Sequence, residues 1–214
     1  MKESSAKKNI LKKIKQALAT PVPVPFADHA STQIFKAPQP DVEVEFAENF
    51  TALQGKFSFC FSAHELVNQL QTLLTTRDWK NIFIKDDVLQ HTLQSAGLKI
   101  NYTNNLSSCD AAITGCEYLI ARTGSIVLSA AQQSGRTVSV YAPVHICIAY
   151  TNQLVYDVQD GLELIQKKYR QLPSLITFAS GPSRTADIEK TLVTGVHGPK
   201  EVFCFLLEAK AHQE

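Results

Sequence analysis

The feature that most constrains the fold is the alternation of short apolar runs with amphipathic segments, which begins at Phe57. Strands of a parallel sheet are buried on both faces, so they appear as continuous apolar runs, and crossover helices connect them. The alternation therefore predicts an α/β domain with a largely parallel sheet. Between Ala111 and Tyr150 several apolar runs follow one another without helices, which predicts a mixed, strand-rich insertion.

The pattern assigns the expected elements to residue ranges. Ser62, followed by Glu65, has the spacing of a helix capping box, and Gly97 is placed to end a helix. Helices are expected over residues 62–76, 86–97, 160–172 and 183–192. Strands are expected over residues 56–62, 81–86, 111–116, 118–123, 125–130, 174–180 and 201–208, with two more within 137–150 that are separated at Pro143.

Residues 4–19 have apolar side chains at helical spacing and lysines on the other face. The apolar face is narrow, which favours a helix that docks on its own domain or on a neighbouring subunit over a helix on a membrane surface. Five prolines follow within residues 21–44, so this stretch is expected to be an extended arm. We therefore expect an N-terminal helix and proline-rich arm over residues 1–45 and an α/β domain over residues 46–214.

Charge and hydropathy exclude several classes of partner. The formal net charge of the 214 residues is +1, which gives no electrostatic case for a nucleic-acid partner. The sequence has no apolar run of about eighteen residues, so no membrane insertion is expected. The N-terminal stretch also lacks the apolar core and cleavage site of a secretory signal. These features predict a cytoplasmic protein.

Five cysteines are present, and none forms a C-x-x-C pair. Cys60, Cys147 and Cys204 lie within apolar runs, where a free cysteine behaves as a small buried hydrophobe. Cys109 and Cys116 alone are too few to hold an iron–sulfur cluster. We expect no metal site and no cofactor in this chain.

The loop after residues 174–180 concentrates special residues. Gly181 lets the backbone turn, and Pro182 stiffens the loop. Ser183 is a natural N-cap for the expected helix 183–192, whose free N–H groups and positive dipole end would attract phosphate or carboxylate. Anion binding and plain helix capping are both open interpretations. The candidate ligand-binding residues in this loop are Gly181, Pro182, Ser183, Arg184, Thr185 and Asp187.

Two histidines are candidates for proton transfer. His197 lies between Gly195 and Gly198, whose permissive backbones could fix it so that it binds an anion or acts as a general base. A histidine that caps a helix C-terminus is the alternative. His145 follows Pro143 near an expected strand end, with a satisfied core histidine as the alternative.

Thr123, Gly124 and Ser125 place two hydroxyls and an unobstructed backbone amide at one tight bend. Such a bend is either an anion-binding nest or a simple hairpin turn. We expect the bends at Gly124, Gly181 and Gly195 to converge on one cleft that accepts a small carboxylate or phosphate.

Taken in order, the segments "ARTGSIVLSA", "GRTVSVYAPVHICIAY" and "SGPSRTADIEKTLVTGVHGPKEVFCFLLE" resemble the lactate utilization protein C family, whose shared unit is the LUD domain. The resemblance covers roughly residues 57–208, and "GPSRTADIE" followed by "GVHGP" is its specific part. It implies a Rossmann-like α/β sandwich of the sugar-phosphate isomerase and CoA-transferase type. One position departs from the pattern, because the family often has an acidic residue before the Thr-Gly of the first segment and this chain has Arg122.

The resemblance also implies a part in the oxidation of L-lactate to pyruvate, alongside two iron–sulfur partner proteins that carry the clusters. It leaves open whether this chain is itself an enzyme. One alternative is a stand-alone transferase or isomerase for a CoA thioester or sugar phosphate, with Glu117 as the nearest candidate nucleophile. The other is a ligand-binding scaffold without catalysis. A homo-oligomer is compatible with all three.

Overall fold

The computed structural model describes residues 5–18, 39–188, 191–195 and 197–209. The chain divides into a unit of residues 1–37 and a unit of residues 38–214, and each is described by itself. In the first unit α1 (Ser5–Leu18) is an amphipathic helix whose apolar residues Ile10, Leu11 and Ile14 are exposed. Among the helices of the described ranges, none has the length and apolar character needed to cross a bilayer.

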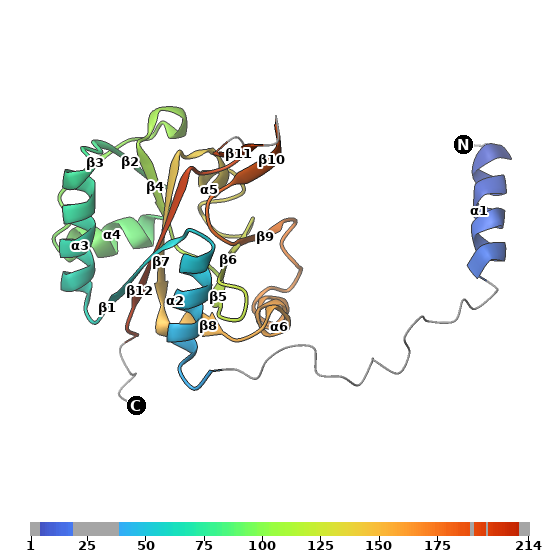
Figure 1. The fold of residues 1–214 in the computed structure, drawn as a ribbon, viewed down its shortest axis with the longest axis horizontal. Coiled ribbons are helices and arrows are strands. Elements are labelled where there is room, and N and C mark those ends of the chain that lie inside the picture. Colours follow the sequence, from blue (N-terminus) through green and yellow to red (C-terminus); the bar gives the residue numbers. More distant parts are fainter. Residues whose placement is uncertain (1–4, 19–38, 189–190, 196, 210–214) are drawn as a thin grey trace. The chain divides into compact units, whose positions relative to one another are not determined.

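The second unit is built on a six-stranded sheet in which every pair of neighbouring strands is parallel, with the order β1-β12-β7-β4-β2-β3 (Figure 1). The central strand β7 pairs with β12 along its whole length, and both are almost completely buried. The largely parallel sheet predicted from the sequence is confirmed. Its strands are β1 (Lys56–Cys60), β2 (Asn81–Ile84), β3 (Asn101–Tyr102), β4 (Ala111–Thr114), β7 (Val144–Tyr150) and β12 (Glu201–Leu207).

Two helices, α3 (Ala63–Thr76) and α4 (Asp87–Ser95), cover one face of this sheet (Figure 1). The Glu65 N–H donates to the Ser62 hydroxyl over 3.2 Å, so the predicted N-cap of α3 is confirmed. The Asp86 carboxylate accepts from the Leu89 N–H in the same way at the start of α4. Both helices bury leucines against the sheet, which makes this face the larger apolar core. A short 3₁₀ helix, η2 (Leu106–Ser108), precedes β4.

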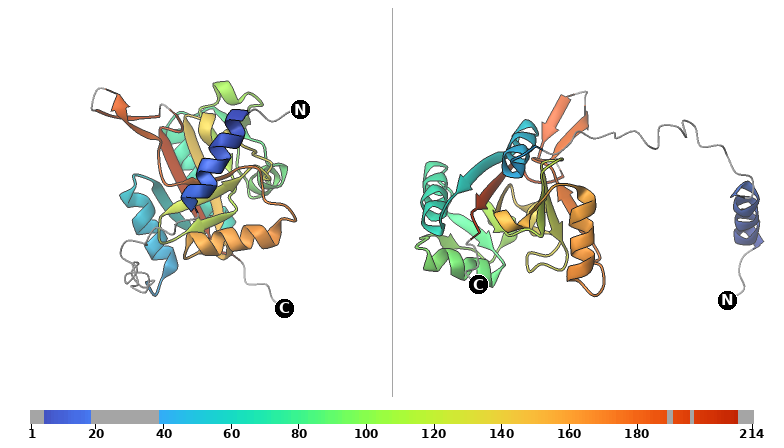
Figure 2. Two further views of the ribbon diagram at one scale, coloured as in Figure 1. Left: turned by 90° about the vertical axis from the view of Figure 1, so that its right-hand side faces the viewer. Right: turned by 90° about the horizontal axis from the view of Figure 1, so that it is seen from below.

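A four-stranded mixed sheet lies against the other face of the main sheet, with the order β8-β5-β6-β9. Helix α2 (Val42–Ala52) packs Phe46 and Phe50 between the two sheets, and α6 (Val158–Lys168) covers the outer face of the smaller one. Figure 2 shows this layering from two further directions. The predicted strand-rich insertion is confirmed. The strands of this mixed sheet are β5 (Tyr118–Ile120), β6 (Ser125–Ser129), β8 (Leu154–Val155), which follows the 3₁₀ helix η3 (Thr151–Gln153), and β9 (Ile176–Ala179). Strands β5 and β6 lie within the predicted range 111–150, whereas β8 and β9 lie beyond it.

The helix predicted over residues 183–192 is wrong. The structure has an antiparallel hairpin there, formed by β10 (Arg184–Ile188) and β11 (Thr191–Thr194), and the hairpin projects from the domain (Figure 2). The segment is rich in threonine, isoleucine and valine, which are stiff at χ1 and favour extended backbone. The N-cap and capping-helix arguments for this loop therefore do not apply.

Two other segments differ from the prediction. Residues 137–142 were expected to form a strand, but they contain the short helix α5 (Val138–Tyr141), and β7 begins directly after Pro143. Helix α2 was not predicted, because the neighbouring prolines suggested an extended arm up to residue 45. The sequence feature that indicates α2 is the pair Phe46 and Phe50, which lie four residues apart on one helix face. Their rings stack with centroids 5.4 Å apart.

Candidate functional site

The C-terminal end of α2 supports two of the predicted glycine turns. Gly124 has a φ of +56°, and a Cβ atom there would lie 2.5 Å from the backbone nitrogen of Phe50. Gly181 has a φ of +92°, and a Cβ there would lie 2.4 Å from the carbonyl oxygen of Leu53. The Asn49 side chain also donates to the carbonyl oxygen of Ala121 over 2.9 Å. Both turns thus require glycine because they lie directly against the backbone of one helix.

A chain of hydroxyl groups connects these two turns. The Ser125 hydroxyl lies 2.8 Å from that of Thr123 and 2.6 Å from that of Ser180. The contact arises because β6 and β9 are antiparallel neighbours, with Ile126 opposite Ala179. Ser125 is buried, whereas Ser180 is exposed, so the chain of hydroxyls leads from the interior to the surface. Ser180 was not predicted as a site residue, although it directly precedes the Gly-Pro pair.

The third bend, at Gly195, is joined to the second by backbone hydrogen bonds. The Ser183 N–H donates to the Pro199 carbonyl oxygen over 2.9 Å, and the Gly195 N–H donates to the Ser183 carbonyl oxygen over 3.0 Å. A Cβ on Gly198 would lie 3.0 Å from that of Ser183. The structure therefore brings the bends at Gly181 and Gly195 together, as it does those at Gly124 and Gly181.

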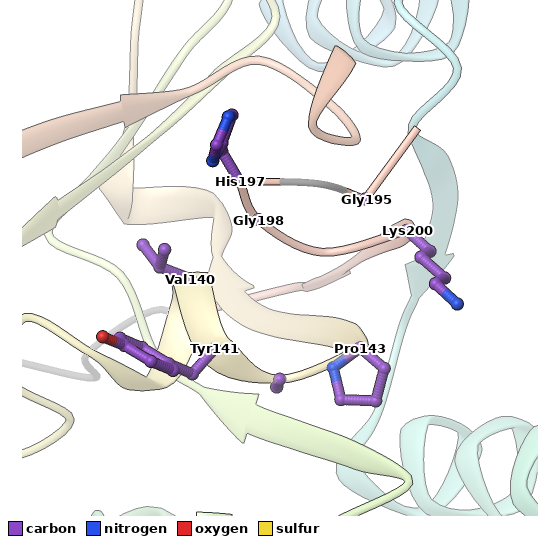
Figure 3. Close-up of a pocket in the computed structure, with 8 residues that line it drawn as sticks. Val140, Tyr141, Pro143, Gly195, His197, Gly198 and Lys200 are labelled. Carbon is purple, nitrogen blue, oxygen red and sulfur yellow. The ribbon is translucent and has the colours of Figure 1, made fainter. Parts of the chain in front are cut away.

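A pocket of about 460 Å³ opens between the Gly195–Lys200 loop and the short helix α5. Figure 3 shows His197 and Gly198 on one side of it, with Val140, Tyr141 and Pro143 on the other. The Lys200 N–H donates to the Pro143 carbonyl oxygen over 2.8 Å, which holds the two sides together. Tyr141 and Lys200 line this pocket and were not predicted. The adjoining sequence "VHGPK" is the signal that could have included Lys200.

The pocket lies at the amino ends of β7 and β12, because Pro143 immediately precedes the first and Lys200 immediately precedes the second. The pocket is therefore at the opposite edge of the sheet from the carboxyl ends of the parallel strands, where ligands of such sheets usually bind. Of the three predicted loops, the Gly195–Lys200 loop lines this pocket, because the β10–β11 hairpin returns the chain to the start of β12. The residues of the Gly124 and Gly181 bends are not among its lining residues.

The remaining residues of the predicted anion loop have other surroundings. An Arg184 guanidinium nitrogen donates to the Leu53 carbonyl oxygen at the end of α2, where helix carbonyls lack partners within the helix. This end of the helix carries partial negative charge, which the guanidinium offsets. Pro182 is half-buried, and Thr185 and Asp187 belong to β10.

His145 lies in the interior of the main sheet and not in the pocket. It is fully buried on β7, and its Nε2 lies 2.8 Å from the Thr114 hydroxyl on the neighbouring strand. Its Nδ1 has no hydrogen-bond partner among the described residues. Burial lowers the pKa of His145 to about 4, so the imidazole is neutral at physiological pH. The interpretation as a core histidine fits this position, and His145 and His197 do not form a pair.

Arg122 stands at the position that departs from the family pattern. Its guanidinium forms a bidentate ion pair with Asp157, the N-cap of α6. Its Nε lies 2.7 Å from Oδ2 and its Nη2 lies 3.0 Å from Oδ1 of the carboxylate. The guanidinium holds the pKa of Asp157 below its usual range. Arg122 thus has a structural partner at the start of a helix, next to the Thr123–Ser125 turn.

Glu117, the candidate nucleophile of a CoA transferase, is enclosed by donors. Its carboxylate accepts from Ser129 over 2.5 Å, from Lys168 over 2.7 Å and from Tyr169 over 2.8 Å. Burial alone would raise the pKa of Glu117, but these hydrogen bonds outweigh it and the pKa is lowered. The side chain has no exposed surface, so this glutamate is a structural anchor for the end of α6.

The described residues contain no group of three or more histidine, cysteine or acidic side chains arranged to hold a metal ion. All five cysteines are free and buried. Cys147 lies opposite Cys204 on neighbouring strands. The Cys147 thiol and burial raise the pKa of Cys116, and the Cys204 thiol and burial raise that of Cys147, both well above the usual range. Both cysteines are core residues.

A protein from Deinococcus radiodurans, described as a DUF162 family protein, has a crystal structure that matches 78% of this chain and 96% of its own chain with a TM-score of 0.60 at 20% identity. This match shows that the fold is shared.

Sequence relatives include lactate utilization protein C of Deinococcus radiodurans, 40% identical over 98 residues that make up 45% of this chain and 46% of the relative. Lactate utilization protein C of a Geobacillus species is 34% identical over 133 residues, which are 60% of this chain and 52% of the relative. An uncharacterized protein of Neisseria meningitidis is 34% identical over 100 residues, which are 47% of this chain and 43% of the relative. The chain thus spans about half the length of these relatives. The model of the LUD domain matches residues 44–207, most of the chain, and the chain therefore belongs to the LUD domain family.

Proposed function

We propose that this chain is a component of a lactate utilization system and takes part in the oxidation of L-lactate to pyruvate with iron–sulfur partner proteins. The observation that carries the proposal is the pocket between α5 and the Gly195–Lys200 loop, which His197 and Lys200 help to line. The names of several relatives, lactate utilization protein C, support the same role.

The pocket residues suit a small carboxylate. In the proposal Lys200, which lines the pocket, supplies positive charge for the carboxylate. In the proposal His197 accepts the hydroxyl proton of a 2-hydroxy acid. Oxidation of the hydroxyl carbon also releases its hydrogen as a second proton, together with two electrons. In this proposal the electrons pass to the iron–sulfur partners and the second proton passes to solvent. The chain then binds and orients the acid and moves its proton.

The size of the pocket is consistent with access by a partner. Its volume of about 460 Å³ lies in the range that holds ligands much larger than a three-carbon acid. A bound lactate would leave space on the open side, next to the exposed ring of Tyr141. In the proposal this space admits the group that accepts the electrons.

No observation specifically supports either alternative, the stand-alone transferase or the scaffold without catalysis. A CoA transferase that uses Glu117 would need an accessible carboxylate, whereas this one is enclosed by Ser129, Lys168 and Tyr169. A scaffold without catalysis would share the same pocket, and only a measurement of turnover separates it from the proposal.

The test is affinity purification of the full chain from its native cell, followed by reconstitution of lactate oxidation. We expect iron–sulfur proteins to co-purify, and we expect turnover of L-lactate to require the chain. Replacement of Lys200 by Glu should abolish that turnover while the partners still co-purify. Turnover that is unchanged without the chain, or purification without any iron–sulfur protein, would overturn the proposal.

A further inference from the structure

An apolar groove with an acidic rim runs between α2 and the edge strand β1. It has a volume of about 590 Å³ and is separate from the His197 pocket. Phe61 is 71% exposed, and its ring lies edge-on to that of Phe59 with centroids 5.0 Å apart. So large an exposed aromatic surface typically marks an interaction site. The apolar lining consists of Val44, Ala47, Phe57, Phe59 and Phe61.

Four carboxylates surround this apolar floor, those of Asp41, Glu43, Glu48 and Glu208. Within the described part of the chain, none of the four forms an ion pair. The groove therefore favours an occupant with apolar side chains on one face and positive charges at the edges of that face. A basic amphipathic helix has this chemistry.

Helix α1 has the complementary composition. It contains five lysines and no acidic residue. Ile10, Leu11 and Ile14 form its exposed apolar stripe, and Lys8 and Lys15 lie beside Leu11. The stripe matches the apolar floor of the groove, and the flanking lysines match its carboxylates.

We propose that the groove of each chain binds helix α1 of a second copy, so that two chains exchange their helices in a two-fold symmetric dimer. In a reciprocal exchange each groove holds one helix and no helix stays unbound. Closed two-fold dimers of this kind are the commonest form of homo-oligomer. Docking of α1 on the groove of its own chain is the other outcome, and the test below separates it, because a chain that binds its own helix stays a monomer. The proposal does not depend on lactate binding.

The test uses two charge-reversal variants of the full chain and measures mass in solution by light scattering. One variant carries Glu43→Lys and Glu48→Lys in the groove, and the other carries Lys8→Glu and Lys15→Glu in α1. Each should dimerise at least roughly tenfold more weakly than the wild type, because two attractive pairs become repulsive. Glu163→Lys, on the exposed face of α6, is the matched control and should dimerise like the wild type.

Mixing the two variants is the decisive step. If helices are exchanged between copies, the reversed helix of one variant meets the reversed groove of the other, and an equimolar mixture regains the dimer. Phe61→Ala, which leaves the charge unchanged, should weaken the dimer as well and guards against misfolding of a charge variant. A wild-type monomer, or a mixture that stays monomeric, would overturn the proposal. So would binding of α1 to anionic vesicles together with a dimer that groove reversal leaves intact.

Discussion

His145 and Thr114 form a polar pair between neighbouring strands inside the main sheet, with the imidazole Nε2 and the hydroxyl oxygen 2.8 Å apart. Because the imidazole is fully buried and its pKa is lowered to about 4, the folded protein keeps this group neutral. An unfolded histidine has a pKa of about 6.5, so it gains a proton at a higher pH than the folded one.

The first prediction follows from this difference. The unfolded state binds the additional proton as the pH falls from about 6.5 to about 4, so the protein should lose roughly 3 kcal/mol of unfolding free energy over that window. A His145→Gln variant should lack this part of the pH dependence, as measured by urea unfolding at several pH values. His91→Gln, at an exposed position on α4, is the control and should keep it. A wild type that is equally stable at both ends of the window contradicts the prediction.

The second prediction concerns the close contact between the Gly124 turn and the backbone of α2. Gly124→Ala should cost more than about 3 kcal/mol of unfolding free energy, because a Cβ at positive φ would also overlap the Phe50 backbone. Gly135 has a similar φ of +66° but open space around it, so Gly135→Ala should cost only about 1 kcal/mol. Denaturant unfolding of both variants isolates the close contact. Equal losses would mean that the contact with α2 is unimportant.

The third prediction concerns the buried Glu117 network. Glu117→Gln should cost roughly 2–4 kcal/mol, because it removes the charge that partners Lys168 and leaves its donors poorly matched. Tyr169→Phe should cost only about 1 kcal/mol, since it removes one hydrogen bond. Thermal unfolding measures both losses, and Glu163→Gln, at an exposed position of α6, is the control. A control loss as large as that of Glu117→Gln would refute the structural role.

The pKa of Glu117 is lowered, so its network stabilises the protein above the ordinary glutamate pKa of about 4.3 and loses that effect as the pH falls below it. The Gln variant should therefore show a shallower acid transition than the wild type in the same assay.

The fourth prediction concerns the thiols. All five cysteines are buried, and the pKa values of Cys116 and Cys147 are raised well above their usual range, so few thiolates exist to react. Iodoacetamide at neutral pH should leave the native chain unmodified, and mass spectrometry should show five additions after unfolding. Rapid labelling of Cys116 or Cys147 in the native chain would show that the sheet interior opens.

The fifth prediction tests the candidate pocket by calorimetry with pyruvate and with inorganic phosphate. Lys200→Ala should weaken anion binding at least roughly tenfold, because a hydrogen bond to a charged group is worth about 1.5–3 kcal/mol. Lys99 lies near the edge strand β3 and does not line this pocket, so Lys99→Ala should leave the affinity unchanged. Equal affinities for the two variants would remove Lys200 from the site.

Much of the fold could be predicted from the sequence because its signals are local. The Ser62–Glu65 cap and the apolar runs of β7 and β12 depend on residues close to one another in the chain. The hairpin of β10 and β11 was missed because its charged and small residues suggested a helix, whereas its β-branched residues favoured strands.

The candidate site was harder to predict, since it depends on long-range contacts. The sequence identified the three glycine bends, but only the structure supplies the reason for their adjacency, which is the end of α2 and the backbone bonds of Ser183. Lys200 and Tyr141 face the same pocket from segments about sixty residues apart, and no local pattern indicates such a pair. The roles of the candidate ligand residues remain predictions.

Helix α2 has two occupied sides. Its inner side and C-terminal end carry Asn49, Phe50 and Leu53, which fix the bends at Gly124 and Gly181, while Val44, Ala47 and Glu48 form a wall of the acidic-rimmed groove. An α-helix is a stiff element, so a force applied at one part of α2 is passed to its other end. A partner bound in the groove would therefore contact the same helix that sets the spacing of the bends at Gly124 and Gly181.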